Sequence, residues 1–352
     1  MRIVLLGDVM LGRLVNRHLA TAAPEHPWGN TLSLLRSADA LVAVLAAAHV
    51  TAVSLANNHS LDYGPDALRD CIAALVRHGI RPAGAGASLE AARRPAEFRA
   101  LETRVACVAF TDNEPEWEAG SPGVHYVPVD PRDRRFARLL TVIKEARRTN
   151  DLVIVSAHWG PNWGYAPPDE HVTAAHLFAD AGADVVLGHS PHVVRGVEIY
   201  RGRPILYSCG NYIDDYAVDA IERNDESFVF CLDYAAGALQ RLLLAPTMIE
   251  DFQARLAQGP DAERIVTRMQ TLCAGLGTEA RPISEGLNVP CPAALNLAGR
   301  FLDAQRAGGN GAAYLPAGVR GIGPAPDPTS APQPIAGSRG PRVRWCCRNT
   351  AG

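Results

Sequence analysis

The chain has 352 residues, of which 47% are hydrophobic and 20% are charged, and its formal net charge at pH 7 is −3. This length and composition provide a sizeable hydrophobic core for one large domain or two smaller ones. A net charge so close to zero argues against a protein built mainly to bind nucleic acid or a membrane surface.

Cysteine usage and the N-terminal residues indicate a reducing compartment. The eight cysteines form no CxxC pair and have no regular spacing, so neither a disulfide framework nor a zinc–thiolate site is expected. The first residues contain no charged lead, no long apolar segment and no cleavage site. We therefore expect no signal peptide, no membrane span and a cytoplasmic protein.

The first predicted strand covers Arg2–Leu6 and is bounded by Gly7. Asp8 is the first polar residue after it, and a carboxylate in this position is either a metal ligand or a helix N-cap. The following stretch, Thr31–Ala48, is rich in Leu and Ala, which favours helix. Two helical pieces are expected there, at Leu32–Arg36 and Ala40–Ala47.

A second short strand, Thr51–Leu55, runs into a polar cluster that contains Asn58, His59 and Asp62. An amide oxygen can bind a divalent cation without adding charge. A histidine beside it can donate a proton to a leaving group. The alternative interpretation is an Asn-rich turn without a chemical role.

Helices and strands then alternate up to residue 149. The predicted helices are Pro65–Gly79, Ser88–Arg94 and Pro131–Thr149, and the predicted strands are Ile80–Ala87 and Thr103–Phe110. The glycines of Ile80–Ala87 indicate a strand that passes close to other backbone. The acidic stretch Asp112–Glu118 is interpreted as a solvated loop, with a cover over the site as the alternative.

Two further predicted strands end in histidines, and imidazole is the commonest metal-binding side chain. Leu152–Ser156 leads to His158, and Asp184–Leu187 leads to Gly188-His189-Ser190-Pro191-His192, with the helix Asp169–Ala181 between them. Each motif alone also has a structural explanation, as a satisfied buried histidine or a polar turn. Strands that alternate with helices and carry polar groups just after their carboxyl ends are typical of an α/β layered fold.

After residue 192 the sequence predicts an antiparallel set of strands that completes a second sheet or an edge. These strands are Gly196–Tyr200, Pro204–Ser208, Ser227–Tyr234 and Leu239–Ala245. Asn211 lies between two of them and is either a hydrogen-bond partner in the site or a turn residue.

The C-terminal part contains two predicted helices, Asp261–Leu276 and Pro292–Ala307. From Gly308 onward Gly, Pro, Ser and Ala dominate, and such a segment buries too little apolar surface to offset its ordering entropy. The expected division is a main domain over 1–250, a helical extension over 251–307 and a disordered tail over 308–352.

The groups at the strand ends form a coherent set of candidate metal ligands. They are Asp8, Asn58, His158, His189 and His192. One carboxylate, one amide and three imidazoles suit Mn, Zn or Fe better than Ca or Mg. One or two such ions could activate a water molecule and polarise a phosphoryl or carbonyl oxygen.

The chain resembles the CapA family, bacterial proteins associated with poly-γ-glutamate capsule synthesis, which is similar to calcineurin-like metallophosphoesterases. The matching stretches, within about residues 1–235, are Gly7 to Arg13, Ser54 to Gly64, Ala157 to Gly160, Gly188 to His192 and Cys209 to Asn211. The resemblance implies a four-layer α/β sandwich of two mixed sheets flanked by helices. It also implies metal ligation by the five residues above, with His59 as a proton donor. Arg13 and Asp62, from the same stretches, complete the expected catalytic residues.

Two departures from the family pattern bear on the second ion. Met10 stands where metallophosphoesterases usually carry a histidine. The usual strand ending in Asn-x-Glu is not found before the Asn57-Asn58-His59 motif, because Ala40–Val50 runs directly into that motif's strand. The sheet is therefore expected to lose an interior strand unless another segment takes its place.

Three functional hypotheses follow. The first is a CapA-type, metal-dependent hydrolase of a phosphoester or a γ-linked glutamyl polymer. The second is a non-catalytic accessory protein of capsule or polyglutamate assembly with a degenerate metal site. The third is a truncated gene product with an incomplete sheet. The expected ligand is a small molecule or an anionic polymer, and the sequence leaves the oligomeric state open.

Overall fold

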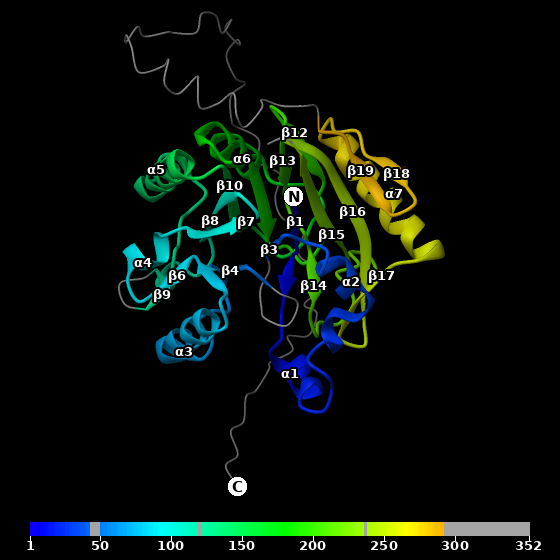
Figure 1. Ribbon diagram of the computed structural model, residues 1–352, viewed down its shortest axis with the longest axis horizontal. Helices are drawn as coiled ribbons and strands as arrows, with labels where there is room; N and C mark the ends of the chain where they lie inside the picture. Colours follow the sequence, from blue (N-terminus) through cyan, green and yellow to red (C-terminus); the bar gives the residue numbers. More distant parts are fainter. Residues whose placement is uncertain (43–49, 119–121, 236–237, 292–352) are drawn as a thin grey trace, which may run out of the picture. The chain divides into compact units, whose positions relative to one another are not determined.

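Two mixed β-sheets lie face to face in the computed structural model, which describes residues 1–42, 50–118, 122–235 and 238–291 (Figure 1). Sheet 1 has the strand order β18-β19-β16-β15-β1-β3-β4-β5, with β17 paired to β16. Its strands are β1 (Arg2–Leu5), β3 (Ala40–Val42), β4 (Ala52–Ser54), β5 (Arg81–Ala83), β15 (Glu226–Ala235), β16 (Ala238–Glu250), β17 (Gln253–Leu256), β18 (Arg281–Ile283) and β19 (Gly286–Val289).

Sheet 2 has the strand order β12-β13-β11-β10-β8-β7. Its strands are β7 (Ala96–Ala100), β8 (Thr103–Thr111), β10 (Leu152–His158), β11 (Val185–His189), β12 (Val197–Tyr200) and β13 (Arg203–Leu206). The four central strands β8, β10, β11 and β13 run parallel, and β7 and β12 are antiparallel edges. Two small pairs complete the strands, β2 (Asp8–Val9) with β14 (Asn211–Ile213) and β6 (Ala85–Gly86) with β9 (Gly123–Val124).

Seven helices surround the two sheets in the described part of the chain. They are α1 (Arg13–Leu19), α2 (Leu32–Leu35), α3 (Gly64–Arg77), α4 (Leu89–Arg93), α5 (Arg134–Thr149), α6 (Asp169–Ala181) and α7 (Gly259–Gly275), with the 3₁₀ turns η1 (His26–Thr31) and η2 (Pro115–Trp117). One hydrophobic cluster joins the outer face of sheet 1 to α1, α2 and α3, and another joins the outer face of sheet 2 to α5 and α6 (Figure 1). The described chain therefore has four layers, as the resemblance to the CapA family implies.

The period-two alternation of strand side chains explains how each strand serves two cores. In β1 and the residue that follows it, Ile3 and Leu5 belong to the cluster between the sheets, whereas Val4 and Leu6 belong to the cluster beneath the helices. Because each sheet is buried on both faces, the sequences of its central strands are continuous runs of mostly apolar residues.

The interior position that the sequence left in question is occupied. β3 lies between β1 and β4 and pairs parallel with both. The prediction of a helix over Ala40–Ala47 is therefore wrong at Ala40–Val42, and its remaining residues lie outside the described part of the chain. A Leu- and Ala-rich sequence favours helix locally. Here the backbone hydrogen bonds to the neighbouring parallel strands β1 and β4 outweigh this preference.

The predicted antiparallel set is divided between the two sheets, which corrects the expectation of a single unit. β12 and β13 extend sheet 2, whereas β15 and β16 pair with each other and with β1 in sheet 1. Periodicity identifies strands but not their partners, because pairing is decided by contacts far apart in sequence.

The segment after residue 250 contains α7, close to the predicted span, and also three strands of sheet 1. β17 and β19 pair with β16, and β18 pairs with β19. These strands have only three or four residues each and so give little periodic signal. The predicted helix Pro292–Ala307 and the predicted tail 308–352 lie outside the described residues. Within the described residues, no helix is long and apolar enough to cross a membrane.

Two buried histidines make the core sensitive to acid. His125 Nδ1–H donates a hydrogen bond to Ala109 O (2.9 Å), and the ring of His171 stacks on Trp159 with centroids 4.5 Å apart. Burial lowers the pKa of His125 and of His171 to about 4, from an ordinary value near 6.5. Both rings are therefore neutral in the folded protein at pH values where the unfolded chain already binds protons.

We expect the free energy of unfolding to fall as the pH is lowered from about 6.5 toward about 4, by up to roughly 1.4 kcal/mol per pH unit for each of these histidines. The stability that they contribute is present above pH 6.5, because a depressed pKa penalises protonation only in the folded state. Urea unfolding in EDTA across this range measures the slope. His125→Gln, which keeps an N–H donor but does not titrate, is expected to have a shallower slope; equal slopes would contradict this assignment.

Candidate metal centre

The carboxyl ends of parallel strands from both sheets converge on one site. Asp8 follows β1, Asn58 and His59 follow β4, and His158 and His189 end β10 and β11. β10 and β11 are neighbours in register, with His158 opposite His189. This edge is where open α/β sheets place their ligands, because several strands deliver side chains to it at once.

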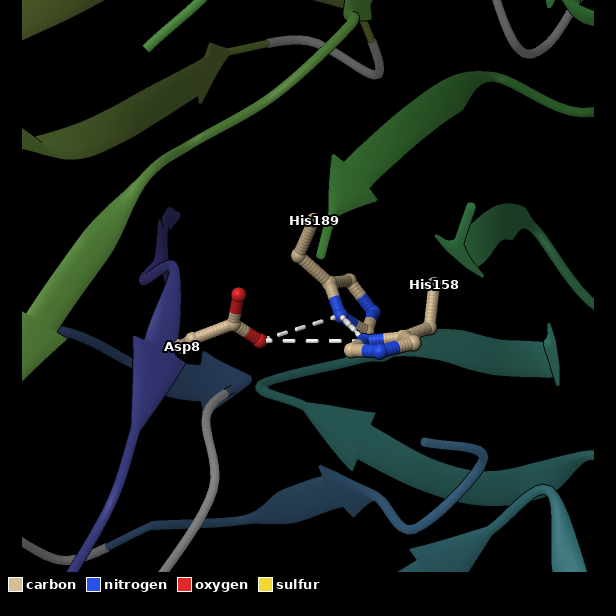
Figure 2. A group of neighbouring side chains, drawn as sticks. All are labelled: Asp8, His158 and His189. Carbon is tan, nitrogen blue, oxygen red and sulfur yellow. Dashed lines mark hydrogen bonds and ion pairs between the residues drawn. The ribbon is translucent and has the colours of Figure 1, made fainter. Parts of the chain in front are cut away.

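Three of the predicted metal ligands meet at the centre of this edge (Figure 2). The Nδ1 atoms of His158 and His189 lie 3.0 Å apart. Asp8 Oδ1 lies 3.3 Å from His189 Nδ1 and 3.9 Å from His158 Nδ1. Both imidazoles are buried, and the carboxylate enters from the side of sheet 1.

These separations fit a shared transition-metal ion. Ligand atoms about 2.0–2.2 Å from a tetrahedral ion stand about 3.3–3.6 Å from one another. The three observed distances, 3.0, 3.3 and 3.9 Å, bracket that range. Two imidazoles and one carboxylate form a donor set that leaves a coordination position open, as in catalytic zinc sites. Asp8, His158 and His189 therefore could hold an ion such as Mn, Zn or Fe.

Hydrogen bonds to the opposite ring nitrogens orient both histidines. Ser156 Oγ lies 2.8 Å from His189 Nε2, and His158 Nε2–H donates to Asn58 Oδ1 at 3.2 Å. When Nε2 carries the proton, Nδ1 keeps its lone pair, and such partners fix the tautomer of metal-ligating histidines. Asn58, expected as a ligand, here contacts the side of the His158 ring away from Asp8.

The charges of the centre suit cation binding. Burial and, to a lesser degree, the neighbouring His189 lower the pKa of His158 to about 3, against the opposing effect of Asp8. Burial alone would raise the pKa of Asp8, but the hydrogen bond and charge of His189, with the charge of His158, hold it well below its usual range. At neutral pH the site therefore presents an ionised carboxylate and a neutral His158.

Ser156→Ala is expected to weaken metal binding by about 10- to 100-fold while leaving the three ligand residues in place, because outer partners hold ligand rings in orientation. Titration with Zn²⁺ against a competing chelator measures the affinity. Ser54→Ala is the control, because Ser54 is also a buried strand serine but its hydroxyl has no hydrogen-bond partner among the described residues. Equal losses in the two variants would show that the effect is not specific to His189.

A cavity of about 280 Å³ opens over the centre and is lined by the strand-end loops. His59 lines it, and its Nδ1 lies 2.9 Å from Asp62 Oδ2. The His59 backbone N–H donates to Asn57 Oδ1 (2.9 Å), which fixes the turn. Since the His59 side chain is 33% exposed, it stands at the mouth of the cavity and is free to meet a ligand.

The other two predicted residues lie further out. His192 lines the same cavity, but its Nδ1 bonds to Asn211 Oδ1 (3.0 Å), and it is not among the three converging ligands. Arg13 lies 3.9 Å from Asp215, and its guanidinium lies 5.3 Å from the centre of the Tyr216 ring. The predicted hydrogen-bond role of Asn211 thus corresponds to a contact with His192.

Two residues of the site were missed in the sequence. Ser156 precedes His158 by two positions in β10 and therefore faces the same side, a signal that alternation provides. Asp214 also lines the cavity, but no strand motif marks it, since it follows the three-residue strand β14. Like Asp8, it is a carboxylate just after a short strand, and this position is the signal that could have identified it.

The fold and the converging ligands define an α/β sandwich with a candidate metal centre, and comparison with known proteins gives its family. Residues 39–216 match the family described as bacterial capsule synthesis protein PGA_cap. A Mycobacterium tuberculosis protein named as a polyglutamine synthesis accessory protein is 37% identical over 268 residues, which cover 72% of this chain and 70% of that protein. The chain belongs to the PGA_cap family, which confirms the resemblance to CapA.

Two further similarities have smaller coverage. The PGA biosynthesis protein CapA of Bacillus subtilis is 34% identical over 178 residues, which cover 49% of this chain and 45% of that protein. Among solved structures, a phosphatase from Mycoplasma pneumoniae aligns with a TM-score of 0.39 and 16% identity, over 60% of this chain and 72% of that chain.

Proposed function

We propose that this protein is a metal-dependent hydrolase of capsule or poly-γ-glutamate synthesis, acting on a phosphoester or a γ-linked glutamyl polymer. The observation that carries the proposal is the convergence of Asp8, His158 and His189 within 4.8 Å of one another. These residues come from three separate strand ends, and two of them are buried. Clustered polar groups of this kind at strand carboxyl ends are typical of catalytic centres.

Asp8, His158 and His189 would hold the ion. A divalent ion bound there would supply a Lewis acid that polarises a phosphoryl or carbonyl oxygen and lowers the pKa of a water molecule. His59 would act as proton donor to the leaving group through Nε2, since its Nδ1–H is directed at Asp62. The Asp62 carboxylate would stabilise the protonated ring, and Arg13 at the rim would attract an anionic substrate.

The composition of the cavity supports a substrate that brings its negative charge to the ion. None of the described residues that line the cavity is Lys or Arg. An anionic group entering this space would therefore find its countercharge at the centre itself and at Arg13 outside the lining. Both proposed substrate classes, a phosphoester and a polyglutamate chain, are anionic.

The second candidate is a non-catalytic accessory role in polyglutamate assembly. It is favoured by the name of the Mycobacterium tuberculosis relative and by Met10, a thioether in the cavity wall beside Asp8. In this case the centre would bind a metal ion or a polymer chain but would not hydrolyse the polymer. The two candidates differ in turnover, not in metal content.

The test uses the full chain loaded with Mn²⁺ or Zn²⁺. The expected result is at least one tightly bound ion, hydrolysis of an aryl phosphate or shortening of poly-γ-glutamate, and loss of both ion and turnover in His189→Ala. His78→Ala, an exposed histidine after α3, is the matched control. Bound metal without turnover of either substrate would favour the accessory role, and a chain that binds no ion would overturn the proposal.

A further inference from the structure

One part of the wall of the cavity over the candidate metal centre is an apolar face of α3. Ala67, Leu68 and Cys71 line the cavity from this helix. Positions one and four apart share a side of a helix, so the three side chains form one continuous surface. Leu68 is 2% exposed and belongs to the hydrophobic cluster on the outer face of sheet 1, and Cys71 packs against that cluster. The apolar wall is therefore anchored in the core.

Further apolar side chains complete the cavity around this face. Met10, Leu11, Leu55 and Ile213 also line it, and most of the surface that the lining residues expose to it is apolar. A cavity of about 280 Å³ is close to the lower end of the range for small-molecule sites, which combine apolar walls with a few placed polar groups. The space beside the candidate metal centre is therefore suited to a compact apolar group.

The proposed proton donor lies on the side of the cavity that α3 forms. The Asp62 N–H donates to His59 O (3.3 Å) and the Gly64 N–H donates to Leu61 O (2.8 Å), so consecutive turns join His59 to the start of α3. Tyr63, within this connection, lines the cavity as well. A general acid must lie within hydrogen-bond reach of the leaving-group oxygen. A leaving group that His59 protonates therefore lies next to the apolar face of α3.

The charges near His59 disfavour a leaving group that carries carboxylates. Asp62 Oδ2 lies 2.9 Å from His59 Nδ1. Burial raises the pKa of Glu114, and the charges of His59 and Asp62 also act on it, so a second carboxylate lies near this histidine. Arg13 lies outside the lining and faces Asp215 (3.9 Å). A γ-linked glutamyl chain has a carboxylate on every residue and would place like charges together here, which is costly.

We propose that the face of α3 formed by Ala67, Leu68 and Cys71 binds the apolar leaving group of a phosphoester, so that the substrate is a phosphate ester of an aryl or alkyl alcohol. This inference rests on the proposed function and narrows it to the first of its two substrate classes. In the reaction, a water oxygen bonds to phosphorus and the bond from phosphorus to the alcohol oxygen breaks. His59 gives its proton to that oxygen, and the proton released by the water restores the ring.

The first experiment measures binding without turnover. Methyl-, butyl- and hexylphosphonate, whose carbon–phosphorus bond is not hydrolysed, are titrated calorimetrically into the full chain loaded with Mn²⁺. The Kd of the wild type is expected to fall by about two- to fourfold for each added methylene group. Ala67→Gln, which places a longer polar side chain on the wall, is expected to lose this dependence, and Cys71→Ser, which keeps the size of the side chain, to weaken it.

Ala73→Gln is the matched control, because Ala73 is exposed on α3 and is not among the described lining residues. It is expected to keep the dependence on chain length of the wild type. Thermal unfolding of each variant shows that it is folded. A Kd of the wild type that does not change from methyl- to hexylphosphonate, or a dependence that Ala67→Gln retains in full, would overturn the apolar site.

The second experiment measures hydrolysis of ethyl, butyl and hexyl phosphate beside glycerol phosphate and poly-γ-glutamate. The value of kcat/KM is expected to rise with the length of the alkyl chain and to be lowest for glycerol phosphate. A protein that shortens poly-γ-glutamate but hydrolyses no alkyl phosphate would overturn the inference and leave the proposed function standing. Tighter binding of longer phosphonates without hydrolysis of any substrate would overturn the proposed hydrolysis and support the apolar binding site alone.

Discussion

Asp8→Asn is expected to lower the affinity for a divalent metal ion by at least about 100-fold and to abolish hydrolysis at metal concentrations that saturate the wild type. The substitution keeps the shape of the side chain and removes its charge. Within the described part of the chain, Asp8 is the only acidic residue of the converging cluster, and its pKa is held well below the usual range by His189 and His158. An amide in this position would leave two imidazoles with no anionic ligand.

Asp62→Asn provides the matched comparison, because it makes the same change at a carboxylate that contacts His59 and none of the three ligands. We expect it to leave metal affinity unchanged and to lower turnover by about 100-fold, the usual contribution of a positioned general acid. Chelator competition measures the affinity and steady-state kinetics the turnover. If Asp8→Asn binds metal as tightly as Asp62→Asn, the centre described here is not the metal site.

The site residues that the sequence predicts correctly are those at the ends of strands. Asp8, His158 and His189 each follow or end a short apolar strand, and parallel strands in one layer bring such residues together. The positions of Asn58 and His192 relative to the candidate metal centre were less predictable. A residue that would bind a metal ion directly and a residue that only hydrogen-bonds to such a ligand both follow a strand end in the sequence. Only the contacts in the folded structure distinguish the two roles.

In the fold too, elements that depend on local sequence signals are predicted correctly, whereas elements that depend on pairing with distant segments are not. The helix α6 begins and ends as predicted because the acidic residues of its first turn, its buried stripe and the left-handed Gly182 after its last residue are all local signals. β3 was missed because Ala40–Val42 has no strand signal of its own and becomes a strand through pairing with β1 and β4. The two-residue strand β2 likewise depends on β14, which is more than two hundred positions away in the chain.

Gly188→Ala is expected to destabilise the protein and to displace His189. A Cβ at Gly188 would lie 2.2 Å from Tyr207 O and 2.7 Å from Tyr207 C, well inside van der Waals contact with backbone atoms. The Gly188 carbonyl also accepts a hydrogen bond from Cys209 N–H (2.9 Å), so the two chain segments cannot separate freely. The added methyl group must push apart β11 and the segment after β13, which carry His189 and Asn211 respectively.

We expect Gly188→Ala to cost about 3 kcal/mol, at the upper end for overpacking, because the clash is with backbone and not with a flexible side chain. For a domain of this size, that corresponds to a Tm lower by roughly 6–12 °C. Metal affinity is expected to fall as well, since His189 directly follows the altered residue. Gly275→Ala is the control, because no atom lies within 4 Å of the added Cβ at the end of α7. A Tm for Gly188→Ala within a degree or two of this control would contradict the close packing that holds the centre together.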